Sequence, residues 1–426
     1  MLRLSINKTL ELTVTRLALI ISFALLCACS PKEKVAAPSN ENAPKKIDTS
    51  AFTAQVGIVA YTSLSAATQA AQSFDSKLAS FMYHPNPVNH TEIKAAWRLA
   101  YDRFLNSLIF SYLPIQDPPD WYSQKIDYKQ LLTQLDSWPI EGGYIDYIEG
   151  YPFSGIVNDL TLDINEDSIH AQHGFTDPTN ASLGYHAIEF MLWGHSGKRQ
   201  SPDFFPQDNT APIPSNDSDA VSEVAESEVF VAEGNQTFKP QNHNRRRQYT
   251  QLLSELLQKD LHRIQRRWEP SSGYYSQLLQ QNTDEDILQA AFIAAQDLIK
   301  IELLDKRFSL TSSEFSQSSH QDLIAIISAI GQWFIPKEPE LQEASLFFLM
   351  QQSDISIAEG FSDSLQTSTA CINRMGSTLA EDSATKTTAA IMTDASSDQC
   401  KQDVITLLSN LRRAAESLQV DLPNLD

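Results

Sequence analysis

Apolar residues recur at three- and four-residue steps over most of this chain, and no segment shows a convincing two-residue alternation. The pattern is clearest at residues 64–81 and 249–268, where it continues for several turns of an amphipathic helix. Further helices are predicted at residues 91–109, 125–135, 288–303, 323–334, 341–358 and 404–418. The periodicity therefore predicts an all-α protein, built from two helical bundles packed side by side.

The first 28 residues have the features of a bacterial lipoprotein signal peptide. Basic residues precede an apolar run at 17–28, which is too short to remain as a membrane-spanning helix. The run ends in Leu26-Cys27-Ala28-Cys29, which resembles a lipobox, so Cys29 is the predicted site of lipid attachment. Ser30 favours the outer membrane over the inner one. We therefore expect a lipid-anchored periplasmic protein; an ordinary cleaved signal sequence is the alternative.

Composition divides the rest of the chain into four parts. Residues 29–50 are rich in Pro, Lys, Asn and Ala and have little to bury, which predicts a flexible tether. An N-terminal helical domain is predicted at 51–206 and a C-terminal helical bundle at 241–426. Residues 207–240 between them are predicted to be an acidic, low-complexity, disordered insertion, because 207–236 hold seven acidic and no basic residues.

The chain is strongly acidic, with 32 basic and 53 acidic residues and a formal net charge of −21. Nucleic-acid binding requires a basic surface, so nucleic acid is excluded as a partner. Cleavage before Cys29 leaves Cys371 and Cys400 besides the anchor. In an oxidising periplasm these two are predicted to form a disulfide, with two free buried thiols as the alternative.

One short segment carries the clearest chemical signal. Residues 184–194 read Gly-Tyr-His-Ala-Ile-Glu-Phe-Met-Leu-Trp-Gly. In a helix, His186 and Glu189 lie three residues apart on one face and can share an ion. An imidazole nitrogen with a carboxylate oxygen suits a divalent metal such as iron or zinc. A buried His–Glu hydrogen bond without a metal is the alternative.

This segment resembles the GxHxxE signature of the imelysin family, iron-regulated periplasmic proteins that are also catalogued as peptidases. Other stretches agree in the family's order, and together they cover roughly residues 55–420: Trp97, Trp138-Pro139, Ile145-Asp146-Tyr147, residues 302–307 and Phe361-Ser362-Asp363. The resemblance implies a two-domain helical protein with a metal site near the domain interface. It also implies an association with bacterial iron uptake.

The resemblance transfers residue by residue onto this sequence. It makes Gly184, His186 and Glu189 the site candidates. Second-rank pocket candidates are Trp138, Asp146, Arg307 and Asp363. Two departures put a complete metal shell in doubt. Leu108 and Ser111 stand where many relatives carry a Glu–Arg pair, and Ser364-Leu365 stands where Asn-Thr-His is common.

The sequence does not support the peptidase label. A helical HExxH, which supplies two zinc ligands and a general base, is absent, and no GxSxG precedes a helix. We therefore expect a non-catalytic binding protein, with iron, haem or an iron carrier as ligand and unknown protein partners in an iron-uptake system. An imelysin-type metallopeptidase and an interaction lipoprotein without a metal are the alternatives.

Overall fold

The computed structural model describes residues 47–113, 128–207, 230–232, 236–238, 241–381 and 395–425. The predicted signal peptide, Cys29 and most of the predicted tether and acidic insertion lie outside these residues. Those assignments stay predictions. None of the described helices has the length and hydrophobicity needed to span a bilayer.

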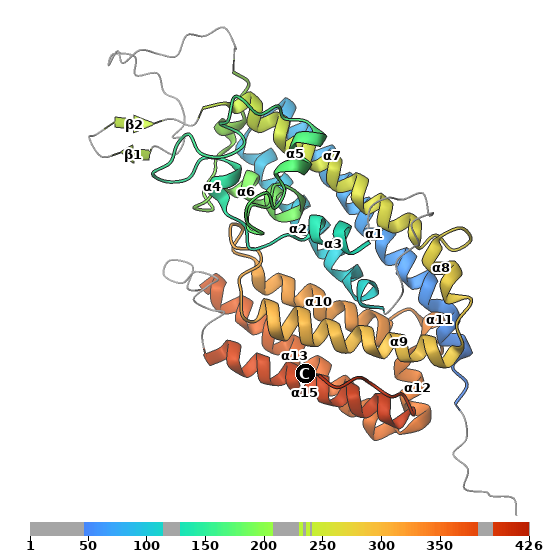
Figure 1. Cartoon of the computed structure of the whole chain (residues 1–426). Helices are drawn as coiled ribbons and strands as arrows, with labels where there is room; N and C mark the ends of the chain where they lie inside the picture. Colours follow the sequence, from blue (N-terminus) through green and yellow to red (C-terminus); the bar gives the residue numbers. More distant parts are fainter. Residues whose placement is uncertain are drawn as a thin grey trace, which may run out of the picture. The chain divides into compact units, whose positions relative to one another are not determined.

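The protein is all-α, as the periodicity predicts (Figure 1). The long helices are α1 (Ser50–Tyr83), α2 (Pro87–Ser107), α7 (His243–Arg267), α9 (Asp284–Asp297), α10 (Ser319–Phe334), α13 (Ile355–Glu381) and α15 (Ala395–Ser417). The shorter ones are α3 (Tyr128–Leu135), α4 (Gly142–Ile145), α5 (Glu166–Gln172), α6 (Gly184–Trp193), α8 (Tyr274–Leu279), α11 (Pro339–Gln342) and α12 (Leu346–Ser353). Two 3₁₀ segments, η1 (Leu108–Tyr112) and η2 (Ser201–Phe204), and a π-helix, η3 (Leu298–Arg307), complete the set among the described residues.

Two short strands lie inside the predicted insertion. Strand β1 (Phe230–Ala232) pairs antiparallel with β2 (Gln236–Phe238), so that Phe230 stands opposite Phe238. No strand is predicted here from the sequence. Three residues are too few for an alternating pattern to be read.

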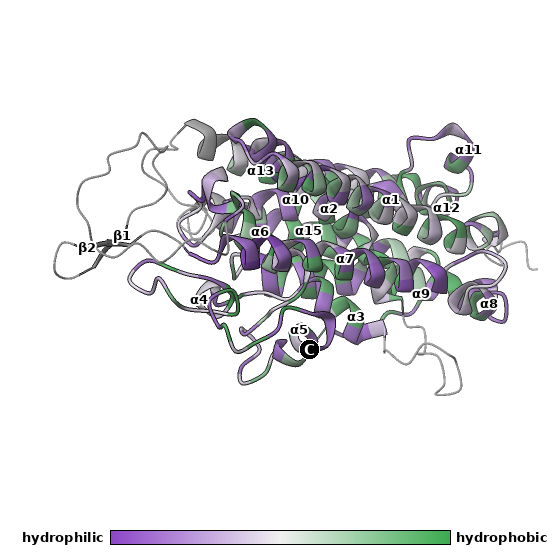
Figure 2. Cartoon of the chain, turned by 90° about the horizontal axis from the view of Figure 1, so that it is seen from above, coloured by the Kyte–Doolittle hydropathy of each residue, from purple (hydrophilic) through white to green (hydrophobic). Residues whose placement is uncertain are grey.

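The long helices carry hydrophobic and hydrophilic residues in alternate patches (Figure 2), and the apolar ones face the core. On α1 the predicted stripe is fully buried from Leu64 to Phe81. Helix α1 packs against α2 and α7, α13 packs against α15, and α10 packs against both α2 and α13. Residues 47–426 form one compact unit by their contacts. The division into two domains is therefore not confirmed and stays a prediction.

Some helix boundaries are set by side-chain caps. Helix α2 begins after Asn86, whose side chain accepts from the N–H of Asn89, with Pro87 at the first helical position. The single helix predicted at 341–358 is wrong, because the chain breaks twice there. The Ser345 hydroxyl caps the start of α12, and Asp354 leaves the helical region before α13 begins.

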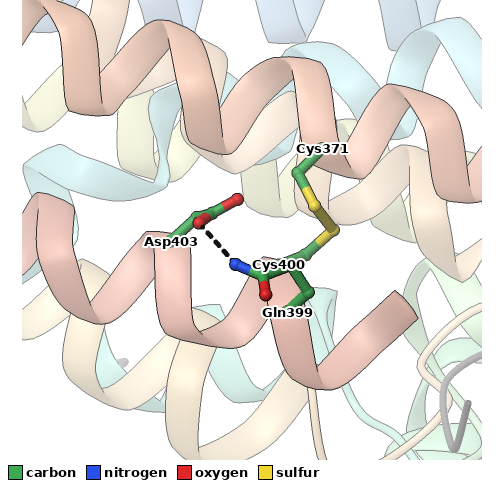
Figure 3. Close-up of a disulfide and its surroundings, with 4 residues drawn as sticks. All are labelled: Cys371, Gln399, Cys400 and Asp403. Atoms are coloured by element: carbon green, nitrogen blue, oxygen red, sulfur yellow. Dashed lines mark hydrogen bonds between the residues drawn. A yellow bond between two sulfur atoms is a disulfide. The ribbon is translucent and has the colours of Figure 1, made fainter. Parts of the chain in front are cut away.

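The predicted disulfide is confirmed. Cys371 on α13 and Cys400 on α15 are bonded, and both side chains are buried between the two helices (Figure 3). Beside the bond, the Gln399 amide donates to Asp403 along the outer face of α15 at 3.1 Å. The bond therefore fixes the pairing of the last two long helices.

Candidate functional site

Helix α6 starts at a glycine because a side chain would not fit there. Gly184 has a φ of +88°, in the left-handed region, and a Cβ on it would lie 2.2 Å from the carbonyl oxygen of Gln134. The start of α6 therefore packs directly on the end of α3. This close approach holds Asp136, just beyond α3, next to His186 on α6.

The His186 side chain is 1% exposed and has a partner at each ring nitrogen. Nδ1 lies 2.8 Å from Glu189 Oε2, while Nε2 lies 2.9 Å from the Tyr101 hydroxyl and 3.3 Å from Asp136 Oδ1. Burial alone lowers the pKa of an imidazole, but hydrogen bonds to Asp136 and Glu189, with their charges, outweigh it and raise the pKa of His186 to about 9. At neutral pH His186 is an imidazolium that donates both of its N–H groups.

Both carboxylate oxygens of Glu189 are also occupied. Oε2 accepts from His186, and Oε1 accepts from the backbone N–H of Ser316 at 2.7 Å and from its hydroxyl at 2.6 Å. Ser316 lies in the segment between η3 and α10, so these bonds tie α6 to a distant part of the chain. The Glu189 side chain is fully buried, and these donors compensate for its lost hydration.

Arg307 and Asp136 form an ion pair beside His186. Arg307 Nη2 donates to Asp136 Oδ2 at 2.6 Å, and its Nη1 donates to the Tyr101 hydroxyl at 3.1 Å; Tyr101 donates in turn to Asp136 Oδ1. Burial raises the pKa of Asp136, but Arg307 and His186 outweigh it and hold that pKa well below its usual range. The Asp136 carboxylate therefore stays charged at neutral pH.

The ionic contacts extend across the fold to α2 and α10. Arg98 on α2 pairs with Asp102 at 2.6 Å and with the buried Asp322 on α10 at 2.7 Å. Arg307 Nη1 lies 3.6 Å from Asp322 Oδ2. Because Arg307 also contacts Asp136 and Tyr101, it connects the Arg98–Asp322 pair to the partners of His186. We call the following residues the signature cluster: Arg98, Tyr101, Asp136, His186, Glu189, Arg307 and Asp322. Their charges join α2, the end of α3, α6, η3 and α10.

As arranged, the His186–Glu189 pair does not fit a metal ion. A histidine ligand must offer a free lone pair, whereas both ring nitrogens of His186 already lie within hydrogen-bond distance of protein groups. Within the described ranges, no group of three or more His, Cys, Asp or Glu side chains could hold a metal. Metal ligation by these two residues stays a prediction. It would require His186 to lose a proton and a hydrogen bond.

The structure brings two of the four pocket candidates to the cluster. Arg307 is a member of it. The Trp138 ring lies beside it, with its centre 6.4 Å from that of His186 and 4.9 Å from the guanidinium carbon of Arg307. The indole face therefore covers the guanidinium of Arg307, and the His186 ring meets the indole in a T-shaped arrangement.

The other two candidates lie elsewhere. Asp146 is fully buried in a separate ion-pair network, 2.6 Å from Arg246 and 3.0 Å from Arg199. Two arginines and a second carboxylate, Asp203, surround Asp146 there, so Asp146 belongs to a structural ion-pair network. Asp363 is exposed on α13.

Four members of the cluster are not among the candidates from the sequence: Arg98, Tyr101, Asp136 and Asp322. Ser316, which contacts Glu189, is not a candidate either. Tyr101 follows Trp97 by one helical turn, and the apolar face of α2 is a signal of its burial. Asp136 stands two residues before the Trp138-Pro139 element. No local signal marks Ser316, because its contact with Glu189 spans 127 residues of sequence.

A cavity of about 430 Å³ lies beside the cluster, with Asp136 in its wall. Leu108 and Ser111 also line it, at the positions where this sequence departs from the imelysin pattern. The wall that η1 contributes is therefore less polar than a Glu–Arg pair would make it.

The chain matches one family model and is similar in fold to solved structures. The family model described as imelysin matches residues 60–415. Among solved structures, the chain is similar to a protein described as an iron-regulated protein A precursor from Parabacteroides distasonis ATCC 8503. That match has 12% identity and a TM-score of 0.59, and covers 88% of this chain and 97% of the other.

It is also similar to an imelysin-like protein from Psychrobacter arcticum 273-4, at 10% identity and a TM-score of 0.55, covering 88% of this chain and 98% of that one. At these identities the two structures show a shared fold. Curated proteins include no match. Because the family model spans most of the chain and its signature forms the start of α6, this protein belongs to the imelysin family.

Proposed function

We propose that this protein is a non-catalytic, iron-linked binding protein, attached by a lipid anchor to the periplasmic face of the bacterial outer membrane. The hydrogen bonds of His186 and Glu189 support the conclusion that the protein is not catalytic. Both nitrogens of His186 and both carboxylate oxygens of Glu189 already have protein partners within 2.9 Å. The signature pair therefore acts as a buried ion pair that joins α6 to the rest of the fold.

This arrangement is poorly suited to hydrolysis. A metallopeptidase uses three protein ligands, an open metal position and a group that accepts a proton from water. With its pKa raised to about 9, His186 is already protonated at neutral pH and is not available as a base. Glu189 is enclosed by His186 and Ser316.

The iron link is supported by family membership and by the similar structure described as an iron-regulated protein A precursor. Since the signature pair does not fit a bare ion as arranged, we propose that the ligand is an iron carrier or haem. It would bind near α6, where the charged residues of the cluster are concentrated.

Elemental analysis, proteolysis and ligand titration of the full-length protein test this proposal together. We expect less than stoichiometric iron or zinc, no cleavage of an unfolded substrate, and one-to-one binding of either haem or ferric citrate. Glu189→Gln is the site variant, and Glu166→Gln, an exposed carboxylate paired with Lys259, is its matched control.

Each alternative has its own outcome. Stoichiometric metal that disappears in His186→Ala would establish a metal site at the signature pair. Reproducible cleavage that is lost in Glu189→Gln and kept in Glu166→Gln would establish a peptidase. If neither haem nor ferric citrate binds, the iron link is wrong.

The lipid anchor is tested separately. Cys29→Ser should lose labelling by a fatty-acid analogue and leave the membrane fraction. Cys27→Ser, two residues earlier, should keep both properties. Equal labelling of the two variants would contradict anchoring at Cys29.

A further inference from the structure

The cavity beside Asp136 has one wall made mainly of aromatic rings. Phe110, Tyr128, Trp268 and Tyr275 line it, and their ring centres lie 5.2 to 6.2 Å from one another in successive contacts. The volume of about 430 Å³ is within the range of small-molecule sites. The rings are tilted or edge-on to one another, at 42° to 78°, and together they give the cavity an apolar wall.

Two carboxylates also line the cavity. The side chains of Glu302 and Asp136 are 7% and 11% exposed. Glu302 accepts from Lys306 Nζ at 2.5 Å and from the Tyr112 hydroxyl, and Arg307 Nε lies 3.5 Å from its Oε2. Glu302 and Lys306 both come from η3, a ten-residue π-helix that continues α9. Such helices are rare and are frequent at functional sites.

Lys306 is the partner that can move. Its side chain is 47% exposed, whereas Glu302 is almost fully buried, so the ammonium can return to water at little cost. The cavity's other lysine, Lys129, is exposed as well. A bound cation can therefore take the place of Lys306 at Glu302 without leaving a buried charge unpaired.

We infer that this cavity binds a small organic cation, with its ammonium group on Glu302 in place of Lys306 and its apolar body against Trp268 and Tyr275. Aromatic faces and carboxylates both attract cations, and the net charge of −21 adds to this attraction. An organic anion would meet the charge of Glu302 once Lys306 has left, whereas Asp136 is already paired with Arg307. This inference goes beyond the proposed iron link and does not depend on it.

Three probes of similar shape and different charge test the inference: naphthylmethylamine (a cation), naphthylmethanol (neutral) and naphthoate (an anion). In calorimetric titrations of the full-length protein, we expect the amine to bind at least about tenfold more tightly than the alcohol and naphthoate not to bind. Glu302→Gln should remove that preference and leave the alcohol's affinity unchanged, which also shows that the variant is folded. Leu132→Trp, which fills the cavity, should weaken both.

The lysine variants decide between a cation and an anion. Lys306→Met should strengthen amine binding several-fold, because the competing ammonium is gone. Lys77→Met, from an exposed ion pair with 46% exposure, is the matched control and should change nothing. Tighter binding of naphthoate than of the amine, or weaker amine binding in Lys306→Met, would overturn the inference. So would equal affinities for all three probes, or no binding of any.

Discussion

Removing the charge of His186 should change how the stability of the protein depends on pH. In His186→Gln the side chain keeps a polar amide and loses the titrating imidazole. The folded pKa of His186 is about 9, above its unfolded value of 6.5. Its contribution to stability is therefore fully present below about pH 6.5 and is lost as the pH rises through about 9.

The size of this contribution follows from the two pKa values. At 1.36 kcal/mol per pKa unit, the difference between 6.5 and about 9 corresponds to about 3 kcal/mol. No reduction for solvent screening is needed, because the side chain is 1% exposed. We therefore expect the difference in unfolding free energy between wild type and His186→Gln to fall by about 3 kcal/mol from pH 6 to pH 10.

Urea unfolding at a series of pH values measures this difference, and subtracting the variant cancels groups whose pKa values do not depend on His186. His90→Gln is the control of opposite sign. Burial, with Lys94 and Arg199, lowers the pKa of His90 to about 3. The difference in unfolding free energy between wild type and His90→Gln should be constant above pH 6.5 and decrease as the pH falls below that value. A wild type minus His186→Gln difference that does not change between pH 6 and pH 10 would refute the imidazolium assignment.

Three further perturbations have outcomes that follow from the structure. Thiol counting in non-reducing denaturant should find no reactive Cys371 or Cys400, and reduction should cost about 3–4 kcal/mol of stability, because the bond closes a loop with a sequence separation of 29. Two free thiols would reject this. Gly184→Ala should cost about 2 kcal/mol or more in urea unfolding, from its positive φ and the contact with α3; an unchanged midpoint would contradict it. Replacing residues 207–236 by a short Gly/Ser linker should leave the thermal midpoint within a few degrees, and a large drop would show a packed element.

The helical periodicity of the sequence determines the fold class and most of the long helices. The stripes on α1 and α7 are buried as predicted, because a three- and four-residue spacing leaves only one face to cover. The disulfide is also readable from the sequence, because few cysteines remain beside the predicted anchor. The helix breaks at Ser345 and Asp354 are not readable, since the apolar pattern continues through them.

The glycine and the His–Glu spacing of the signature are local features as well. A three-residue spacing on a helix places His186 and Glu189 next to each other on one face, and their side chains are in contact here. The spacing alone leaves both a metal site and a buried hydrogen bond open. It contains no information about the charge of the imidazole.

Only the tertiary structure decides that charge. Asp136, Tyr101 and Ser316 reach the pair across 50, 85 and 127 residues of sequence. Helical phase shows which face of each segment is buried, but the partner it meets depends on how all the helices pack together. The pKa of His186 is set by burial and by these distant groups, and so the chemistry of the signature depends on the packing of helices that are far apart in the chain.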